Sequence, residues 1–275
     1  MFQGKRIAVT VPAYNEEALI ASVVRNMPAY VDRIYFVNDG STDGTRQIVS
    51  QICQHNGRFV LIDHPANRGV GAAITTGYKK SLEDDMDITV VMAGDNQMDP
   101  TQLLSLLAPV IEEKAGYSKG NRMSCLRHMK GMSLWRRFGN WLLRWLTRIS
   151  SGNYKVMDPQ NGYAAVSAEA LKSIDLDSVY PYYGYCNDLL AKFTVAGVRV
   201  VEVPMPARYQ GEKSKIKYGA YTIRVGGLLL RNFGWRMRSK AASLARRRAA
   251  ANREEDRMLP HLILDQNKPR RESRH

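Results

Sequence analysis

The chain has 275 residues, of which 44% are hydrophobic and 24% are charged, and this composition excludes a disordered chain. The 40 lysines and arginines outnumber the 26 aspartates and glutamates, giving a net charge of +14. Such a charge favours an acidic partner: nucleic acid, a phosphorylated ligand or an anionic membrane. The 3 cysteines have no CxxC spacing, so they indicate neither a disulfide framework nor a structural zinc site and fit a reducing compartment.

The first hundred residues alternate between short apolar runs and amphipathic stretches. We expect strands at residues 6–11, 33–37, 58–62 and 88–92, and helices at residues 16–27, 44–55 and 71–82. Strands separated by helices predict βαβ units, and therefore an α/β fold with a doubly wound, mostly parallel sheet. Ligands of such sheets bind beyond the carboxyl ends of the strands.

Polar loops follow all four expected strands. They cover residues 12–17, 38–44, 65–69 and 94–97, and three of them carry carboxylates. Loops rich in Asp, Asn and Gly are also ordinary turn and helix-cap chemistry, so a structural role stays open for any one of them. Because the four converge on one edge of the sheet, together they predict a ligand site.

The second half of the chain is less regular. Residues 133–149 have helical periodicity, with Arg137, Arg144 and Arg148 on one face. The opposite face carries Leu134, Phe138, Trp141, Leu142, Trp145 and Ile149. Two interpretations remain open: a helix lying in a membrane interface, or a helix packed on the sheet with solvated arginines. A strand at 198–203 and a basic, apolar helix at 220–240 follow, and then a charged tail that we expect to be flexible.

The basic excess is confined to two segments. Residues 119–157 carry nine basic and no acidic side chains, and residues 208–248 carry twelve basic and one acidic. Separate basic segments indicate local anion sites or patches facing an anionic membrane, and they do not favour a nucleic-acid partner. We find no uncharged apolar stretch of about 18 residues and no signal-peptide pattern. We therefore expect a cytoplasmic protein, peripheral on the cytoplasmic face of a membrane.

A series of motifs resembles one known family. In order they are VPAYNEE, VNDGSTDGT, NRGVG, GDNQMDP, KGNR, DPQNGY, YCNDLL and RYQGEKSK. The series is similar to family 2 glycosyltransferases of the GT-A fold, and most similar to the dolichyl- and polyprenyl-phosphate sugar synthases and related bacterial polysaccharide enzymes. The resemblance implies a single Rossmann-like catalytic domain over residues 1–220, divided into a nucleotide-binding half (1–118) and an acceptor-binding half (119–220). A basic amphipathic segment (221–245) and a charged tail (246–275) would follow.

The resemblance implies a site for a nucleotide-sugar donor. It implies that Asp39 accepts a hydrogen bond from a ring N–H of the nucleobase. It places Pro12, Tyr14 and Glu16 along the base and ribose. Independently, Glu16 is a favourable charge in the first turn of the expected helix. Arg68 precedes a helix N-terminus that favours an anion. Further cations expected to reach the diphosphate are Arg122, Arg208 and Lys215.

The diphosphate leaving group calls for a hard cation, Mg or Mn. The resemblance assigns Asp95 and Gln97 as its ligands, but Ala93 stands where the family places a first aspartate. We therefore expect weak metal binding, completed by the diphosphate and water. Asp99, before Pro100, is expected to begin the next helix.

Asp188 and Asp158 are the candidate catalytic residues. The resemblance makes Asp188 a general base and Asp158 an acceptor-side residue, while helix capping and a tight turn are their structural alternatives. An acceptor phosphate hardly needs a base, because it is already an anionic nucleophile. We expect an inverting transfer to a polyprenyl phosphate. Alternatives are a lipid-linked saccharide or polysaccharide hydroxyl as acceptor, or a nucleotide-sugar-binding scaffold weakened by Ala93. His55, His64 and His128 are expected to be surface or core residues, and the oligomeric state is open.

Overall fold

The computed structural model describes residues 1–95, 97–125, 134–206 and 223–242. The chain divides into two compact units, residues 1–233 and residues 234–275, and the sheet lies in the first. The predicted boundary between residues 118 and 119 falls inside a strand of this sheet. The boundary predicted at residue 220 falls outside the described residues.

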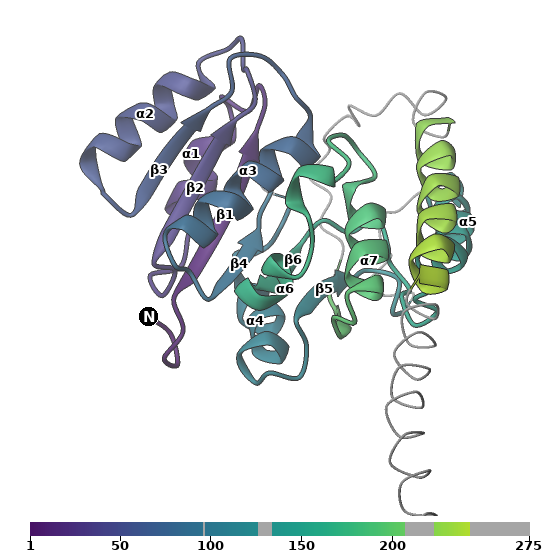
Figure 1. The fold of residues 1–275 in the computed structure, drawn as a ribbon. Helices are drawn as coiled ribbons and strands as arrows, with labels where there is room; N and C mark the ends of the chain where they lie inside the picture. The colour runs from purple at the N-terminus through teal and green to yellow at the C-terminus, as the bar shows by residue number, and fades with distance from the viewer. Residues whose placement is uncertain (96, 126–133, 207–222, 243–275) are drawn as a thin grey trace, which may run out of the picture. The chain divides into compact units, whose positions relative to one another are not determined.

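Four parallel strands form the first half of the sheet (Figure 1). They are β1 (Ile7–Ala13), β2 (Arg33–Asn38), β3 (Phe59–Asp63) and β4 (Ile88–Val91). The helices between them are α1 (Ile20–Arg25), α2 (Thr45–His55) and α3 (Val70–Glu83). All seven predicted elements are confirmed, and so is the parallel direction of the strands.

Helix α1 is shorter than predicted. It begins at Ile20, because the residues before it bond elsewhere. Glu16 N donates to Thr45 Oγ1 at 2.8 Å, and Glu17 N donates to Asp43 Oδ2 at 3.2 Å. These N–H groups therefore tie the first loop to the second instead of opening a helix.

The second half of the chain adds three strands to the sheet. In chain order its elements are η1 (Pro100–Gln102), α4 (Leu103–Ile111), β5 (Tyr117–Asn121), α5 (Leu134–Ser151), β6 (Ala164–Ser167), α6 (Ala168–Lys172), η3 (Leu176–Ser178), α7 (Tyr185–Val195) and β7 (Val200–Pro204). Residues 223–242 form a further helix. The strand order is β3-β2-β1-β4-β6-β5-β7.

Strand β6 runs antiparallel to both of its neighbours, β4 and β5, and β7 is parallel to β5. Strands β5 and β7 therefore point the same way as β4. The loop that precedes β6 lies at the edge where β4 and β5 end. Residues 157–163 consequently reach the same edge as the loops of the first half, which periodicity alone did not predict.

Helices cover both faces of the sheet, as burial of a parallel sheet requires. Side chains of α1, α2 and α4 pack on one face and those of α3, α6 and α7 on the other. Helix α3 lies close to β1 because Gly77 has no side chain: a Cβ there would stand 2.2 Å from Thr10 Cγ2. Each buried Val, Ile or Leu of these layers contributes roughly 1.5–3 kcal/mol.

Helix α5 exposes its apolar face. The side chains on this face are 41–55% exposed: Phe138, Trp141, Leu142, Trp145, Leu146 and Ile149. The opposite stripe is buried although it is polar, since Thr147 and Ser151 are fully buried and Arg148 Nε donates to Val156 O at 2.6 Å. The predicted separation of faces is confirmed. The interpretation with a packed apolar face and solvated arginines is wrong.

Helix α5 is held through polar contacts to its neighbour. Ser150 Oγ donates to Leu229 O at 2.7 Å, which joins α5 to residues 223–233 of the following helix (Figure 1). Within that helix, Ile223 and Leu230 are more than three-quarters exposed. No helix among the residues that the structure describes is long and apolar enough to cross a membrane.

Candidate active site

The candidate site lies where the strand order changes direction. Strand β1 has β2 on one side and β4 on the other, and such a switch point opens a crevice at the carboxyl ends of the strands. Gly94 N donates to Pro12 O at 3.3 Å, which brings the loops after β1 and β4 together. Tyr163 OH donates to Asp99 O at 3.0 Å and adds the loop before β6.

The loops after β1 and β2 are bonded to each other. Thr42 N donates to Asn15 Oδ1 at 2.9 Å, and Asn15 N donates to Ser41 Oγ at 3.1 Å. Glu17 accepts from Gly44 N at 2.9 Å and so places its carboxylate at the N-terminus of α2, where a negative charge is favourable. The predicted role of Glu16 as a charge in the first turn of its own helix is wrong, because α1 begins at Ile20 and has no acid in its first turn.

Pro12, Tyr14 and Glu16 lie beside this switch point. Pro12 is the penultimate residue of β1, and the Tyr14 side chain is 40% exposed. Glu16 is half-buried and begins the turn before α1. The three residues line the edge at which the resemblance places a base and ribose, and that role stays a prediction.

Asp39 is a buried junction between two loops. It follows β2, and its carboxylate receives three donors, all from the segment after β3. Arg68 N donates to Oδ1 at 2.9 Å and Gly69 N donates to Oδ2 at 2.8 Å. His64 Nδ1 lies 2.7 Å from Oδ1. A carboxylate has about four acceptor positions, so the three donors found among the described residues leave one position, on Oδ2, without a donor.

Arg68 is exposed at the same edge, held there through its backbone by Asp39. The glycines around it serve the fold: a Cβ on Gly69 would stand 2.4 Å from Pro181 O, and one on Gly71 2.3 Å from Tyr180 O. Ala72 N also donates to Pro181 O, at 3.0 Å. The chain's own residues 180–182 therefore lie close against the backbone at this helix N-terminus.

Asp95 and Gln97 form the loop after β4. Gln97 N donates to Asp95 Oδ1 at 3.1 Å, which curls the loop around the carboxylate. Asp99 accepts from Thr101 N at 2.9 Å and begins η1, as predicted. The described residues hold no group of three or more His, Cys, Asp or Glu that converges as a metal site. Asp95 and Gln97 as ligands of a cation stay a prediction, which would supply one carboxylate and one amide oxygen.

Arg122 and Asp158 form a buried ion pair. Asp158 is fully buried and receives Arg122 Nε at 2.8 Å, Arg122 Nη2 at 3.0 Å and Arg122 N at 3.0 Å. Burial alone raises the pKa of Asp158, but the Arg122 charge and hydrogen bonds outweigh it and hold that pKa below 3.8. Asp158 therefore orients Arg122, and no face of its carboxylate reaches the edge of the site.

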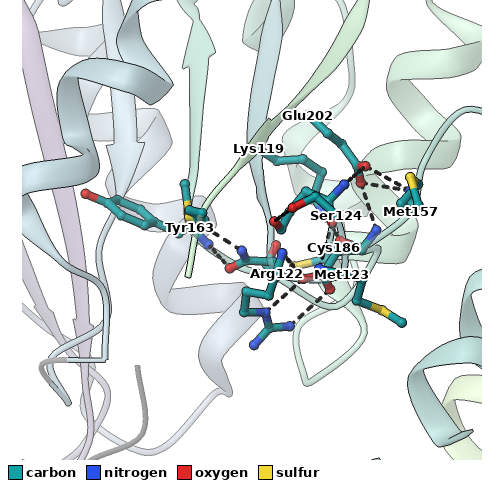
Figure 2. A network of polar contacts seen from close by, with 12 residues as sticks. Lys119, Arg122, Met123, Ser124, Met157, Tyr163, Cys186 and Glu202 are labelled. Carbon is teal, nitrogen blue, oxygen red and sulfur yellow. Dashed lines mark hydrogen bonds and ion pairs between the residues drawn. The ribbon is translucent and has the colours of Figure 1, made fainter. Parts of the chain in front are cut away.

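A second carboxylate, Glu202, supports this pair from β7. It accepts from Asp158 N at 2.9 Å, Met157 N at 2.9 Å and Asn121 Nδ2 at 2.9 Å. Burial raises the pKa of Glu202. Lys119, opposite Glu202 in the parallel register, is fully buried and donates to Asp158 O. Figure 2 shows Lys119, Arg122 and Glu202 in one network.

Sequence patterns missed Lys119 and Glu202. Glu202 had an available signal, because it is the lone charge in the apolar strand β7 and an unpaired buried charge is costly. Strand β5 is too polar for Lys119 to stand out in the same way. His64 was also underestimated, because it was expected to be an ordinary surface or core residue. It is buried, but it lies against Asp39 and, through Nε2, 3.0 Å from Thr76 Oγ1.

Asp188 lies in the first turn of α7 and is 1% exposed. Its carboxylate accepts from Tyr180 N at 2.9 Å and from Arg231 Nη2 at 3.3 Å, and Lys192 Nζ lies 3.7 Å away. Gly184 is the N-cap of α7, so the capping alternative is wrong. Asp188 joins α7 to the helix that begins at residue 223. Arg208 and Lys215, the remaining predicted site residues, lie outside the described residues.

The model of one protein family, described as glycosyl transferase family 2, matches residues 8–175. The chain belongs to glycosyl transferase family 2. This assignment confirms the resemblance that the motifs indicated, and it makes the protein a glycosyltransferase. The matched range takes in the loops after β1 to β5 and the loop before β6.

Curated relatives of this glycosyltransferase align over most of their own length. It is 32% identical to the UDP-N-acetylglucosamine--dolichyl-phosphate N-acetylglucosaminyltransferase of Methanococcus voltae, over 74% of this chain and 86% of that one. It is 29% identical to the undecaprenyl-phosphate mannosyltransferase of Micrococcus luteus, over 73% and 82%. Both relatives are named for a sugar transfer to a polyprenyl-type phosphate.

Among solved structures, the glycosyltransferase resembles glucosyl-3-phosphoglycerate synthase of Mycobacterium tuberculosis with a TM-score of 0.63 at 24% identity. The match covers 84% of this chain and 81% of the synthase, which was crystallised with Mn²⁺, UDP and glucosyl-3-phosphoglycerate. At this identity the likeness establishes the GT-A fold alone. The predicted fold class is confirmed.

Proposed function

We propose that the glycosyltransferase moves a sugar, with inversion, from a nucleoside-diphosphate sugar to a polyprenyl phosphate at a membrane surface. One observation carries the proposal: a cluster of polar loops at the carboxyl edge of the sheet belongs to the same unit as a helix, α5, that turns its apolar face outward. The named activities of the Methanococcus and Micrococcus relatives support the same acceptor class.

The donor is proposed to bind with its base at Asp39. The acceptor position that remains on Asp39 Oδ2 suits a ring N–H, which uracil and guanine present and adenine does not. Pro12, Tyr14 and Glu16 would line the base and ribose. UDP- and GDP-sugars are accordingly the proposed donors.

A divalent cation, Mg or Mn, is proposed to neutralise the diphosphate as it leaves. The residues present fit such an ion in part, because Asp95 and Gln97 offer two oxygen ligands and Ala93 offers none. The diphosphate and water would complete its coordination. Arg68 and Arg122 add fixed positive charge, with Arg208 and Lys215 proposed for the same task.

The state of the buried aspartates supports a phosphate acceptor. Asp158 is paired with Arg122, and Asp188 faces Arg231 and Lys192, so neither is exposed to accept a proton from a hydroxyl. A phosphate oxygen needs no such base. It would attack the anomeric carbon directly, and the electron pair of the breaking bond would pass to the diphosphate oxygen.

Membrane attachment is proposed to use α5. Burying the exposed face that holds Trp141 and Trp145 in the headgroup region removes apolar surface from water, while the basic segment 119–157 attracts anionic lipid. The free Cys53, Cys125 and Cys186 fit a reducing compartment. We therefore place the reaction on the cytoplasmic face.

The test is release of nucleoside diphosphate from a panel of UDP- and GDP-sugars, with Mn²⁺ or Mg²⁺, with and without a polyprenyl phosphate. We expect acceptor-dependent release that Asp95→Ala lowers at least about 100-fold through loss of the cation's carboxylate. Asp99→Ala, which removes the cap of η1 two residues beyond Gln97, is the matched control and retains release.

Ala93 favours a second candidate function, a nucleotide-sugar-binding scaffold, because it removes a family carboxylate from the cation site. The release assay with the panel of UDP- and GDP-sugars distinguishes the scaffold from the transferase. Tight nucleotide binding without release, whatever the acceptor, supports the scaffold and contradicts the transferase.

A further inference from the structure

His64 bridges the two loops that meet at Asp39. Its main-chain N–H donates to Asn38 O at 2.9 Å, so the residue is fixed beside the end of β2. Its imidazole is buried, with Nδ1 against Asp39 Oδ1 and Nε2 against Thr76 Oγ1 of α3. Both ring nitrogens are therefore held, one by the loop and one by the helix.

The contact with Asp39 fixes the role of one ring nitrogen. An ionised carboxylate only accepts, so Nδ1–H donates to Asp39 Oδ1, while Nε2 lies 3.0 Å from the Thr76 hydroxyl oxygen. His64 and Arg68 N both donate to Oδ1, while Gly69 N alone donates to Oδ2. The donors thus leave the open acceptor position on Oδ2.

The orientation of a carboxylate is weakly restrained by its own torsion, because the Cβ–Cγ bond of aspartate has broad minima. Three donors from fixed backbone and ring positions restrain it here. Gly40 keeps the segment after β3 close, since a Cβ at this residue would stand 2.6 Å from Asn67 N. Without the imidazole donor, the carboxylate could rotate about the Cβ–Cγ bond, which would move both Oδ1 and Oδ2.

We infer that His64 is a positioning residue for nucleotide binding: its Nδ1–H fixes the Asp39 carboxylate so that Oδ2 faces the base. The inference rests on the proposed function, because it needs a base at Asp39. His64 touches neither substrate nor cation, and its effect is on donor affinity.

Two substitutions separate positioning from simple packing. His64→Asn keeps a side-chain N–H near the place of Nδ1 and loses the Thr76 contact. His64→Gln places its amide near Nε2 and loses the Asp39 contact. Each removes one hydrogen bond of a buried ring, so we expect the two variants to unfold at similar temperatures.

Titration calorimetry of UDP and GDP, with Mn²⁺ present, gives the decisive comparison. We expect His64→Asn to bind the preferred nucleotide within about threefold of the unaltered protein, and His64→Gln about tenfold more weakly. In turnover, His64→Gln raises the donor KM by a similar factor and leaves kcat at saturating donor unchanged. His55→Gln, on the exposed His55 of α2, is the control and binds normally.

Equal loss of affinity in both His64 variants, or no loss in either, would overturn the inference, as would a fall in kcat with an unchanged KM. These outcomes leave the proposed function intact. If the unaltered protein binds neither UDP nor GDP, the proposed function fails first, and the positioning role fails with it.

Discussion

The first half of the sheet, β1 to β4, and the second half, β5 to β7, place polar and apolar groups in opposite ways. In the first half, apolar strands with no charge in their interiors lie between helices that pack apolar side chains on them. The second half buries Lys119 and Asp158, while α5 leaves its tryptophans exposed. The first arrangement is that of a soluble enzyme core. The second arrangement is favourable when the exposed apolar face of α5 contacts an apolar partner, because this removes its side chains from water.

The buried charges are expected to matter most for stability. Asp158→Asn removes the charge that pairs with Arg122, and breaking a buried ion pair costs about 3–5 kcal/mol of unfolding free energy. Asp177→Asn is the matched control, because Asp177 pairs with Lys79 on the surface, where such pairs contribute at most about 1 kcal/mol. Urea unfolding measures both. Equal losses would contradict the larger contribution assigned to the buried pair.

The same pair predicts a pH dependence. Arg122 holds the pKa of Asp158 below 3.8, so its stabilisation is present above that value and is lost as the pH falls through the lower, folded-state pKa. The difference in unfolding free energy between the unaltered protein and Asp158→Asn should therefore shrink below about pH 3.8. A difference that stays constant from pH 7 to the acid limit would contradict a charged Asp158.

The exposed face of α5 is expected to decide membrane binding. Replacing both Trp141 and Trp145 by Glu should weaken binding to anionic vesicles by at least about 100-fold, because each buried aromatic ring contributes about 1.5–3 kcal/mol. Tyr154→Glu, at a 63% exposed tyrosine outside the helix, serves as control. Unchanged sedimentation of the double variant with vesicles would show that this face meets something else.

Asp188 is expected to have a smaller effect on rate. If it only joins α7 to Arg231, Asp188→Asn lowers kcat less than about tenfold, whereas loss of a general base costs about 10²–10⁴. The kcat at saturating donor and acceptor is the quantity to compare. A thousandfold fall would restore Asp188 as a base and make a hydroxyl the acceptor.

The smallest effect is expected in the first half. Glu17→Gln keeps an oxygen for Gly44 N but removes the charge at the N-terminus of α2, which should cost about 0.3–1 kcal/mol of unfolding free energy. Glu83→Gln, in the last turn of α3 where the helix dipole disfavours an acid, should not lower it. Calorimetric melting of both variants checks the sign of each change.

The sequence predicted the first half well because its residues obey the periods of buried strands and amphipathic helices. Strand β2, for example, is buried at five of its six positions and contains no charge beyond Arg33. The loops of the site follow from where such strands end. Family motifs then indicated Asp39, Arg68 and Asp95 as the residues to examine.

Periodicity did not predict the segments in which polar residues are buried and apolar residues are exposed. Strand β5 contains Lys119, a glycine and an asparagine, and β6 is only four residues long. Neither therefore has the hydrophobic periodicity by which a strand is recognised. Arg122 and Arg231, which pair with Asp158 and Asp188, come from distant segments, and local spacing carries no sign of them. The catalytic roles expected for both aspartates stay predictions, to which the structure adds these ion pairs.

We propose a phosphate as the acceptor, because a phosphate oxygen needs no side-chain base. This proposal is tested most directly by offering vesicles that contain either a polyprenyl phosphate or the matching polyprenol, with the preferred nucleotide sugar, and measuring nucleoside diphosphate release. We expect release of nucleoside diphosphate with the polyprenyl phosphate and only background release with the polyprenol. Comparable release with the polyprenol would contradict the proposal.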